Sequence, residues 1–361
     1  MRTICADKYN IHIGHDSLAE LDTFLSKSYY SSFIILVDEN TKKKCLPIVR
    51  KSFSTAHSLY IIQIKSGEKN KNIRNCEKIW RELSGQNADR ESLIINLGGG
   101  VITDIGGFAA STYKRGIDFI NIPTTLLAQA DTSVGGKTGI DFMNFKNQIG
   151  TFAFPKAVFI HPLFLETLDK KELLSGFAEV IKHGLIADKN YWEQIQASVG
   201  RDLKSRPAES WNKLISESVE IKIKIVVADP YENGLRKALN FGHTIGHAIE
   251  SASLKSKKKM LHGEAIALGM ICEAYLSRKC CGLSSQELDS ITEFIVSIFK
   301  PPPLKSQAKQ LIGLMQQDKK NKDSEINFTL LSAIGKAEIN NSCSEELIEE
   351  SIHFLNAICN Q

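Results

Sequence analysis

Several absences narrow the class of protein that this 361-residue sequence can encode. No stretch approaches the roughly 18 apolar residues that a helix needs to cross a bilayer, and the N-terminus carries no long apolar core of the secretory kind. The formal net charge is only +4 with both signs interspersed, which is too weak and diffuse for nucleic-acid binding. These absences favour a cytoplasmic enzyme with a small anionic ligand.

Cysteine is present but unpatterned. The eight cysteines form no C-x-x-C pair, and only Cys280 and Cys281 are adjacent. This spacing argues against a zinc ribbon or a disulfide framework and predicts reduced, buried thiols. The hydrophobic share of 42% and the charged share of 24% are typical of a soluble globular protein. The length is sufficient for two domains with separate cores.

Hydrophobic runs predict the fold class. Short apolar runs separated by helix-length segments indicate strands buried on both faces of a mostly parallel sheet. The runs are Phe33–Val37, Leu59–Ile64, Leu93–Leu97, Phe119–Ile122 and Ala157–Ile160. We therefore expect an α/β protein whose residues 1–165 form a Rossmann-like domain.

After about residue 165 the pattern changes to long stretches of helical period, followed by two short runs that indicate a hairpin. The helical stretches are Lys170–Leu185, Ala208–Val227, Phe241–Ser251, Gly263–Arg278 and Gln286–Phe299, and the runs are Ile326–Leu331 and Ala337–Ile339. Residues 166–361 are thus expected to form a mostly α-helical domain, with the active site in the cleft between the domains.

Two glycine-rich segments suggest anion binding. Gly98-Gly99-Gly100 follows an apolar run and opens a predicted helix, where backbone amides suit a pyrophosphate. The dinucleotide-binding fingerprint G-x-G-x-x-G is incomplete, because Thr103 occupies the position of its last glycine. A tight turn that binds no nucleotide therefore remains an alternative. Gly136-Lys137-Thr138 imitates the end of a P-loop, but Asp131 occupies the first glycine position, and a nucleotide-hydrolysing P-loop is excluded.

Histidines suggest a metal site. His243 and His247 are four residues apart and so share one helix face, and His262 heads the next helix. Glu179 is a carboxylate among apolar neighbours, and two imidazoles with one carboxylate would leave an open coordination position. Three alternatives stay open. A pair of histidines four residues apart without an H-E-x-x-H motif more often has no metal-binding role. Glu179 could instead pair with His183, and Glu264 competes with Glu179 as the third metal ligand.

The segments together resemble the 3-dehydroquinate synthase family of the sugar phosphate cyclases. The resemblance runs in family order over nearly the whole chain. Its segments are SGEKNK (66–71), GGGVITD (98–104), YKRG (113–116), IPTTLLAQADTSVGGKTGID (122–141), KNQIG (146–150), GFAEVIKHG (176–184), GLRKALNFGHTIGHAIE (234–250), LHGEA (261–265) and QDKKN (317–321).

The resemblance implies a set of site residues. A divalent metal, zinc or cobalt, would be held by Glu179, His243 and His262, leaving His247 to face the substrate as the candidate for proton transfer. The positions matching the family's NAD site are Asp38, Glu68, Lys71, Gly100, Val101, Asp104, Thr124, Thr125, Lys137, Lys146 and Thr167. Those matching its substrate pocket are Asp131, Lys137, Lys146, Asn147, Lys222, Arg236, Asn240, His247 and Lys319. Arg115 matches an arginine lent to the neighbouring subunit, which implies a homodimer.

The family reaction converts 3-deoxy-D-arabino-heptulosonate 7-phosphate to 3-dehydroquinate and phosphate, a step of the shikimate pathway. It combines transient oxidation by NAD, β-elimination of phosphate, re-reduction and an intramolecular aldol closure, so the net reaction is that of a lyase. The alternatives are another cyclase that makes an inosose or a valiolone, a metal-dependent alcohol dehydrogenase, and an inactive binding protein. Asn240 and Lys319 favour the dehydroquinate reaction among the cyclases.

Overall fold

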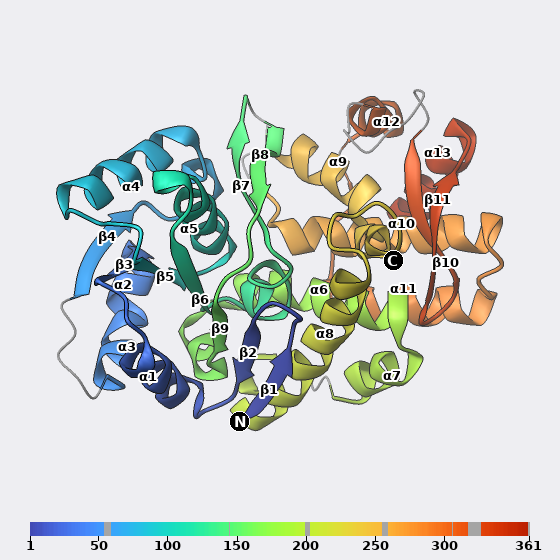
Figure 1. Ribbon diagram of the computed structural model, residues 1–361. Coiled ribbons are helices and arrows are strands. Elements are labelled where there is room, and N and C mark those ends of the chain that lie inside the picture. The colour runs from blue at the N-terminus through green and yellow to red at the C-terminus, as the bar shows by residue number, and fades with distance from the viewer. Residues whose placement is uncertain are drawn as a thin grey trace. The chain divides into compact units, whose positions relative to one another are not determined.

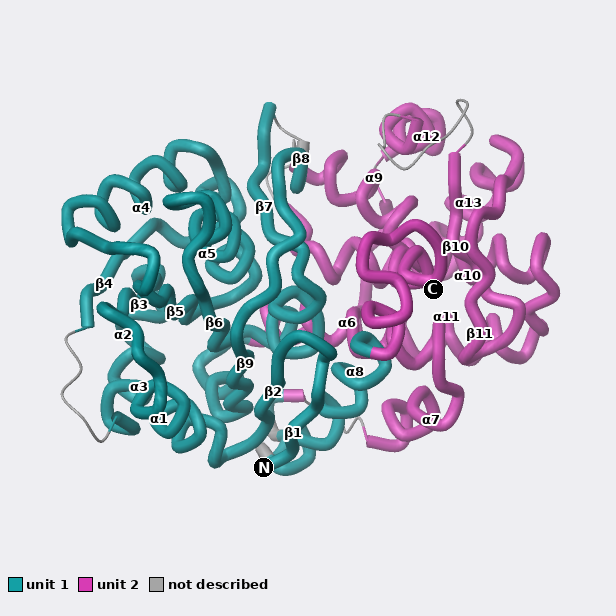
Figure 2. The backbone as a smooth tube through the Cα atoms, viewed as in Figure 1, with its two compact units in different colours: residues 1–169, 204–223 teal, residues 170–203, 224–361 magenta. Residues whose placement is uncertain are grey.

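The computed structural model describes residues 1–53, 59–143, 145–198, 203–254, 259–304, 306–316 and 326–359. The chain divides into two compact units, coloured separately in Figure 2. Unit 1 comprises Met1–Asp169 and Lys204–Ile223, and unit 2 comprises Lys170–Leu203 and Lys224–Gln361. The segment Lys204–Ile223 thus belongs with the first unit. The assignment of cofactor binding to 1–165 and of metal and substrate binding to 166–361 stays a prediction.

Unit 1 is built on a seven-stranded sheet with the order β1-β2-β9-β6-β5-β3-β4 (Figure 1). Within the described part of this sheet, β1 and β2 pair antiparallel and all other neighbouring strands pair parallel. Two further strands, β7 and β8, pair with each other. The strands are β1 Arg2–Cys5, β2 Asn10–Ile13, β3 Ser32–Asp38, β4 Leu59–Ile64, β5 Ser92–Gly98, β6 Asp118–Pro123, β7 Lys137–Phe142, β8 Phe145–Phe152 and β9 Ala157–Ile160. The predicted parallel strands are confirmed.

Helices cover both faces of this sheet, because alternate residues of each strand face opposite sides. On β3, Ile34 and Leu36 pack into one hydrophobic cluster with α4 and α5, and Ile35 and Val37 pack into another with α1 and α3. The helical segments are α1 Ser17–Lys27, α2 Glu39–Lys44, α3 Leu46–Lys51, η1 Glu68–Asn70, α4 Ile73–Gly85, α5 Gly100–Thr112, η2 Tyr113–Arg115, the π-helix η3 Ala128–Thr132, η4 Pro162–Thr167 and η5 Leu203–Ser205.

Unit 2 is mostly helical, with one antiparallel hairpin, as predicted. Helix α8 begins in unit 1 and ends in unit 2. The elements are α6 Lys170–Ala187, α7 Lys189–Ser198, α8 Ala208–Ala228, η6 Leu235–Asn240, α9 His243–Ser253, α10 His262–Cys280, α11 Ser285–Phe299, α12 Ala308–Gln316, β10 Asn327–Ala333, β11 Lys336–Ser342 and α13 Glu345–Cys359. None of the described helices is long and apolar enough to cross a membrane.

Two expectations need correction. Helix α9 begins at His243 rather than at Phe241, because Gly242 takes a left-handed conformation with φ 80° and ends the preceding turn. The thiols are not all buried: Cys45, Cys76 and Cys272 are, whereas Cys5 and Cys280 are exposed. The cause is position, because Cys280 is the last residue of α10, where the helix reaches solvent.

Candidate metal centre and nucleotide edge

A cluster of histidines and a carboxylate forms in unit 2, where α10 packs against both α6 and α9. Glu179 lies in the middle of α6 and is completely buried. Its Oε1 atom lies 3.6 Å from Nε2 of His243, at the start of α9, and 3.6 Å from Nε2 of His262, at the start of α10. Two imidazole nitrogens therefore converge on one carboxylate oxygen, as ligands of one metal ion would.

His247 joins the same cluster. Its ring centroid lies 5.2 Å from that of His243 and 5.7 Å from that of His262. The nitrogen ligand atoms of the three histidines lie within 4.8 Å of one another. The geometry brings His247 close enough to act beside a metal, and its substrate-facing role stays a prediction.

The outer nitrogens of two histidines are held by acceptors. His243 Nδ1 lies 3.1 Å from the carbonyl oxygen of Phe241, and His262 Nδ1 lies 3.2 Å from Oε2 of Glu250. An acceptor at Nδ1 favours the tautomer that carries its proton there, which leaves the Nε2 lone pair directed at the cluster. This orientation of both rings is that of metal-ligating histidines, so the residues present fit a divalent cation.

Electrostatics around Glu179 also suit a cation. Buried Lys182, one turn further along α6, forms an ion pair with Glu179. Burial and the charge of Lys182 lower the pKa of His243 well below its usual value, so this ring is neutral and available as a ligand. Burial also acts to lower the pKa of His262, but hydrogen bonds to Glu179 and Glu250 outweigh it and raise the pKa to about 9, so a metal ion bound there would displace a proton from this ring.

Close helix contacts bring the ligands together. A Cβ atom at Gly263 would stand 1.9 Å from the carbonyl oxygen of Ser175, and the Gly263 amide donates to Ser175 Oγ at 3.0 Å. Ser175 lies one turn before Glu179 on α6, so this contact places His262 beside that carboxylate. Buried Glu273 accepts hydrogen bonds from the amides of Gly242 at 2.6 Å and Ile245 at 3.1 Å, which caps α9 where His243 begins it.

Glu264, the competing ligand, has another role in the structure. Its Oε2 atom accepts a hydrogen bond of 2.8 Å from the amide of Leu261 and caps the start of α10.

Three residues of the site, Lys182, Glu250 and Glu273, were not predicted from the sequence. Lys182 follows Glu179 at i+3, a spacing that signals a shared helix face. For Glu273 no local signal exists, because its partners lie about thirty residues away.

In unit 1 the predicted nucleotide residues other than Lys137 and Lys146, which lie on β7 and β8, lie at or after the carboxyl ends of the parallel strands. β3 and β5 are neighbours, but the chain leaves β3 toward β4 on one side and leaves β5 toward β6 on the other. Open α/β sheets bind ligands at such a switch point. The residues at or after these ends are Asp38 at the end of β3, Glu68 and Lys71 after β4, Gly100, Val101 and Asp104 after β5, Thr124 and Thr125 after β6, and Thr167 after β9.

Ion pairs connect several of these residues. Lys71 Nζ lies 2.6 Å from Oδ2 of Asp104 and 3.7 Å from Oε1 of Glu68, and Lys146 Nζ on β8 lies 3.9 Å from the same Glu68 oxygen. Burial acts to lower the pKa of Lys71, but Asp104 and Glu68 outweigh it and raise the pKa, so the ammonium is retained. The backbone amide of Asn147 donates a hydrogen bond of 2.9 Å to Oδ1 of Asp141.

The glycine-rich turn after β5 is tightly packed. A Cβ atom at Gly99 would stand 2.9 Å from Thr125 Cγ2, and one at Gly100 would stand 2.9 Å from Thr132 Oγ1. The Thr124 amide donates to the Gly98 carbonyl at 2.9 Å, which joins the ends of β5 and β6. Helix α5 then begins without a side-chain cap, which leaves its first amides available to an anion.

The predicted substrate residues lie in several places. In unit 1, Lys222 on α8 contacts Asp131 at 2.6 Å, and Lys137 begins β7. In unit 2, buried Arg236 lies on η6, and Asn240 at its end donates to Glu232 at 2.9 Å. Lys319 lies outside the described residues.

Arg115 is not grouped with the nucleotide residues. It lies after the C-terminal end of α5, which runs back from the carboxyl end of β5, and it is exposed with φ 70°.

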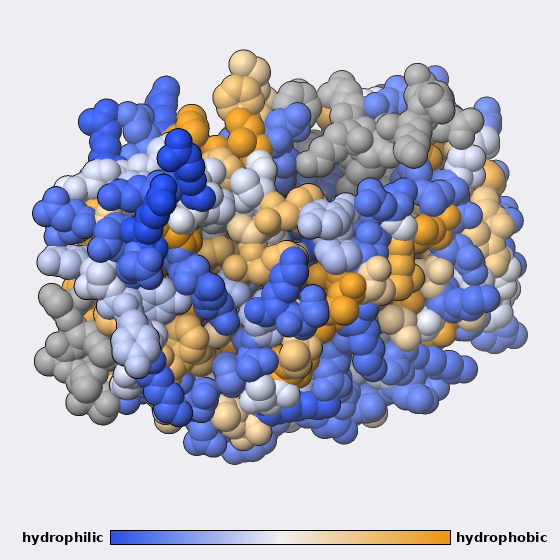
Figure 3. Space-filling view, in the orientation of Figure 1, coloured by the Kyte–Doolittle hydropathy of each residue, from blue (hydrophilic) through white to orange (hydrophobic). Residues whose placement is uncertain are grey.

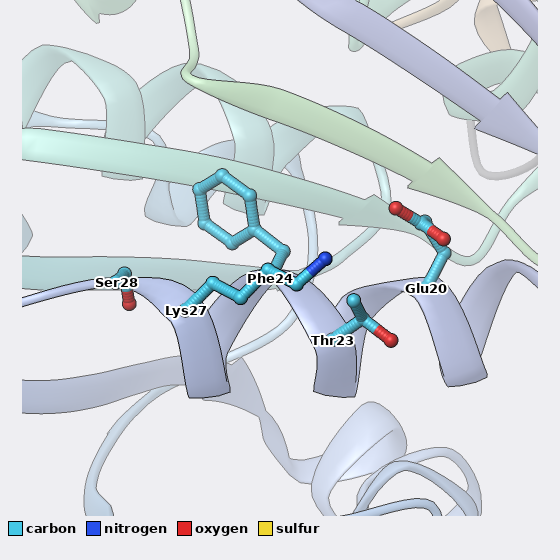
Figure 4. A pocket seen from close by; sticks show the side chains of 5 residues that line it. All are labelled: Glu20, Thr23, Phe24, Lys27 and Ser28. Carbon is cyan, nitrogen blue, oxygen red and sulfur yellow. The ribbon is translucent and has the colours of Figure 1, made fainter.

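A pocket elsewhere on unit 1 contains none of the predicted site residues (Figure 4). It is lined by Glu20, Thr23, Phe24, Lys27 and Ser28 of the α1 segment.

Comparison with known proteins gives concordant matches. A family model described as 3-dehydroquinate synthase N-terminal matches residues 61–175, and one described as 3-dehydroquinate synthase C-terminal matches residues 176–321. A 3-dehydroquinate synthase from Parabacteroides distasonis is 45% identical over 345 residues, covering 95% of this chain and 96% of that protein.

Solved structures share the fold. A 2-deoxy-scyllo-inosose synthase complexed with carbaglucose-6-phosphate, NAD⁺ and Co²⁺ has a TM-score of 0.88 at 24% identity, covering 98% of this chain and 99% of that one. A 2-epi-5-epi-valiolone synthase from Streptomyces hygroscopicus with NAD⁺ and Zn²⁺ bound has a TM-score of 0.85 at 24% identity, covering 98% of both chains.

Proposed function

This chain belongs to the 3-dehydroquinate synthase family. From that premise we propose that it converts 3-deoxy-D-arabino-heptulosonate 7-phosphate to 3-dehydroquinate and phosphate. The enzyme would be a carbon–oxygen lyase of the cytoplasm that depends on a metal and on NAD. The observation that carries the proposal is the convergence of His243 and His262 on Glu179 at 3.6 Å each, in a chain of this family.

Glu179, His243 and His262 would hold the divalent metal, zinc or cobalt. Bound there, the metal supplies Lewis-acid chemistry, which lowers the pKa of a coordinated hydroxyl. Glu250 orients the His262 ring through its contact with Nδ1, and the Phe241 carbonyl does the same for His243. His247, within reach of both rings, is the side chain that would move a proton beside the substrate.

Residues at the carboxyl edge of the unit 1 sheet would hold NAD. Bound there, NAD supplies a temporary store for one hydride, so no net NADH accumulates. The α5 N-terminus would meet the pyrophosphate, and Asp38, Glu68, Lys71, Asp104, Thr124, Thr125 and Thr167 would bind the remaining polar groups. The Lys71 ammonium, kept charged by Asp104, would balance anionic charge there.

The carboxylate and phosphate of the substrate require cations. Lys137, Lys146, Lys222, Arg236 and Lys319 would supply them, with Asp131, Asn147 and Asn240 as further polar contacts. Asp131 holds the Lys222 ammonium through two contacts, with its carboxylate at 2.6 Å and its carbonyl at 2.8 Å, which orients it for an anion. Charge-assisted hydrogen bonds of about 1.5–3 kcal/mol each would dominate substrate binding.

The test of this function follows three products at once. Metal-loaded protein, catalytic NAD and the heptulosonate phosphate should yield phosphate and dehydroquinate in equal amounts without net NADH. A chelator should abolish turnover, and added zinc or cobalt should restore it. Turnover of a different sugar phosphate instead would indicate the inosose or valiolone type of cyclase, and accumulation of NADH would indicate a dehydrogenase. Absence of phosphate release alongside an active control enzyme would refute the proposal.

A second prediction concerns Glu250. Glu250→Gln should weaken metal binding roughly 10–100-fold, because the uncharged amide is a poorer acceptor for the Nδ1 proton of His262. Competition with a chromophoric chelator measures the affinity, and the visible spectrum of the cobalt-loaded protein reports altered ligand geometry. Partly exposed Glu349→Gln on α13 is the control. Unchanged affinity in Glu250→Gln would remove this residue from the site.

A third prediction concerns the homodimer. The β7–β8 hairpin exposes Phe142, Met143, Ile149 and Phe152, by 39%, 75%, 37% and 46%, and Figure 3 shows hydrophobic side chains gathered at its tip. Such side chains support a contact between copies of the chain, and Arg115 would enter the partner's site.

Subunit exchange tests this arrangement. Arg115→Ala and Lys222→Ala should each be inactive alone. After exchange, half of the dimers contain one chain of each variant, and each of these mixed dimers holds one intact site out of two, so the mixture should regain about a quarter of the wild-type activity. If mixed dimers isolated through a different affinity tag on each variant regain no activity, Arg115 belongs to its own subunit's site.

A further inference from the structure

Two thiols from distant parts of the sequence lie side by side in unit 2. Cys280 is the last residue of α10 and is exposed, and Cys343 directly follows β11 and is partly exposed. Their Sγ atoms are 3.8 Å apart. Neither residue belongs to the metal or nucleotide residues described above.

Neighbouring contacts hold both thiols in place. On α10, Ser277 Oγ accepts a hydrogen bond of 2.8 Å from the Leu331 amide of β10, and Cys281 Sγ donates to Asn341 Oδ1 of β11 at 3.4 Å. The end of α10 is therefore fastened to the hairpin on both sides of Cys280. The adjacent Cys281 is directed at Asn341, which leaves Cys280 as the thiol that faces Cys343.

We propose that Cys280 and Cys343 form a dithiol modification site that reacts with a low-molecular-weight disulfide such as oxidised glutathione to give an intramolecular disulfide. A disulfide requires a sulfur separation of about 2.05 Å. Sulfurs that lie 3.8 Å apart must therefore approach by about 1.8 Å, and side-chain rotation about the Cα–Cβ bonds is the motion that moves them. The exposure of Cys280 gives the reagent access.

The reaction proceeds in two exchanges. The Cys280 thiolate attacks one sulfur of the external disulfide RSSR, forms a mixed disulfide and releases RSH. Cys343 then attacks the Cys280 sulfur, forms the internal bond and releases the second RSH. Two electrons pass from the cysteine pair to RSSR, and the two thiol protons end on the two RSH molecules.

The environment sets the order of attack. Burial, together with the neighbouring Cys280, raises the pKa of the Cys343 thiol, so Cys343 stays protonated. The exposed Cys280 therefore reacts first. Once Cys280 is part of a mixed disulfide it no longer raises the pKa of Cys343 through its charge, so Cys343 can lose its proton and resolve the mixed disulfide.

The bond would join α10 to the β10–β11 hairpin, which also supports η6. Thr329 Oγ1 of the hairpin donates to the Lys237 carbonyl of η6 at 2.8 Å, and Lys237 Nζ donates to Asn340 Oδ1 at 3.0 Å. Cys280 and Cys343 are 63 positions apart in the sequence, so a disulfide between them closes a long loop and restricts the unfolded chain. The oxidised protein should therefore unfold at a higher temperature.

The experiment uses the full chain with Cys5→Ser, which removes the other exposed cysteine. The folded, zinc-loaded protein is incubated with oxidised glutathione, alkylated and analysed by mass spectrometry after digestion. The expected product is a crosslink between Cys280 and Cys343 that dithiothreitol reverses, with a Tm raised by roughly 5 °C or more. Cys343→Ser should instead retain one glutathione on Cys280 and show no rise in Tm.

Cys281→Ser is the matched control, since it alters the adjacent thiol and should crosslink like the parent. A lasting glutathione adduct on Cys280 in the parent would overturn the proposal, because Cys343 would then not resolve it. A crosslink that persists in Cys280→Ser would assign the chemistry to Cys281. Unreacted thiols under conditions that modify a small-molecule thiol would also overturn it.

Discussion

Glu179→Gln is expected to abolish tight metal binding and, with it, turnover. The substitution preserves the shape of the side chain but removes the charge on which His243 and His262 converge at 3.6 Å each. Loss of a direct ligand should weaken metal binding by more than the roughly 10–100-fold that loss of an outer partner costs. Metal content after gel filtration and competition with a chelator measure the effect.

The same substitution separates the electrostatic role of Glu179 from its ligand role. Lys182 is buried and would lose its ion pair with Glu179, which should lower the free energy of unfolding by about 3–5 kcal/mol. The double variant Glu179→Gln, Lys182→Met should recover much of that stability without recovering metal binding. Glu172→Gln, an exposed position on the same helix, is the control. Full metal stoichiometry with unchanged affinity in Glu179→Gln would refute the metal assignment.

The second large effect is expected at Gly269, where α9 and α10 cross. A Cβ atom there would stand 2.0 Å from the Gly242 carbonyl oxygen and 2.7 Å from the Gly246 amide nitrogen. These are backbone atoms that cannot move aside, so the helices must separate. Gly269→Ala should lower the free energy of unfolding by about 3 kcal/mol or more. It should also weaken metal binding, because the two helices carry His243 and His262.

Gly313→Ala is the matched control. Gly313 lies inside α12, and a Cβ atom there would meet nothing within 4 Å. Because alanine favours the helix more than glycine does, this variant should gain up to about 1 kcal/mol. Thermal and denaturant unfolding measure both variants. Equal stability of the two would show that the α9–α10 contact is looser than the structure indicates.

The sequence alone was sufficient for the elements and the family. The run Phe33–Val37 predicted a strand buried on both faces, and alternate residues of β3 do pack into two separate hydrophobic clusters. Such patterns are local, so they can be read without knowing the partners. The start of α9 was misplaced because Gly242 adopts a left-handed conformation next to α10, a contact that lies outside the local pattern.

The candidate site was only partly accessible to the same reasoning. The i,i+4 spacing of His243 and His247 predicted a shared helix face, but it left Glu179, His183 and Glu264 as competing partners. Geometry now places Glu264 in a helix cap and Glu179 beside two imidazoles. Glu250 and Glu273 escaped notice because their contacts join residues 12 and about 30 positions apart.

By itself, the sequence determined that this is an α/β chain of the 3-dehydroquinate synthase family, because periodicity and motif order are properties of the chain. Only the tertiary structure decided which side chains meet. It turned both imidazoles toward Glu179 through acceptors at Nδ1, and it brought Cys280 within 3.8 Å of Cys343. The physical reason is that distances between distant residues depend on how helices pack, and this packing rests on close contacts such as those at Gly263 and Gly269.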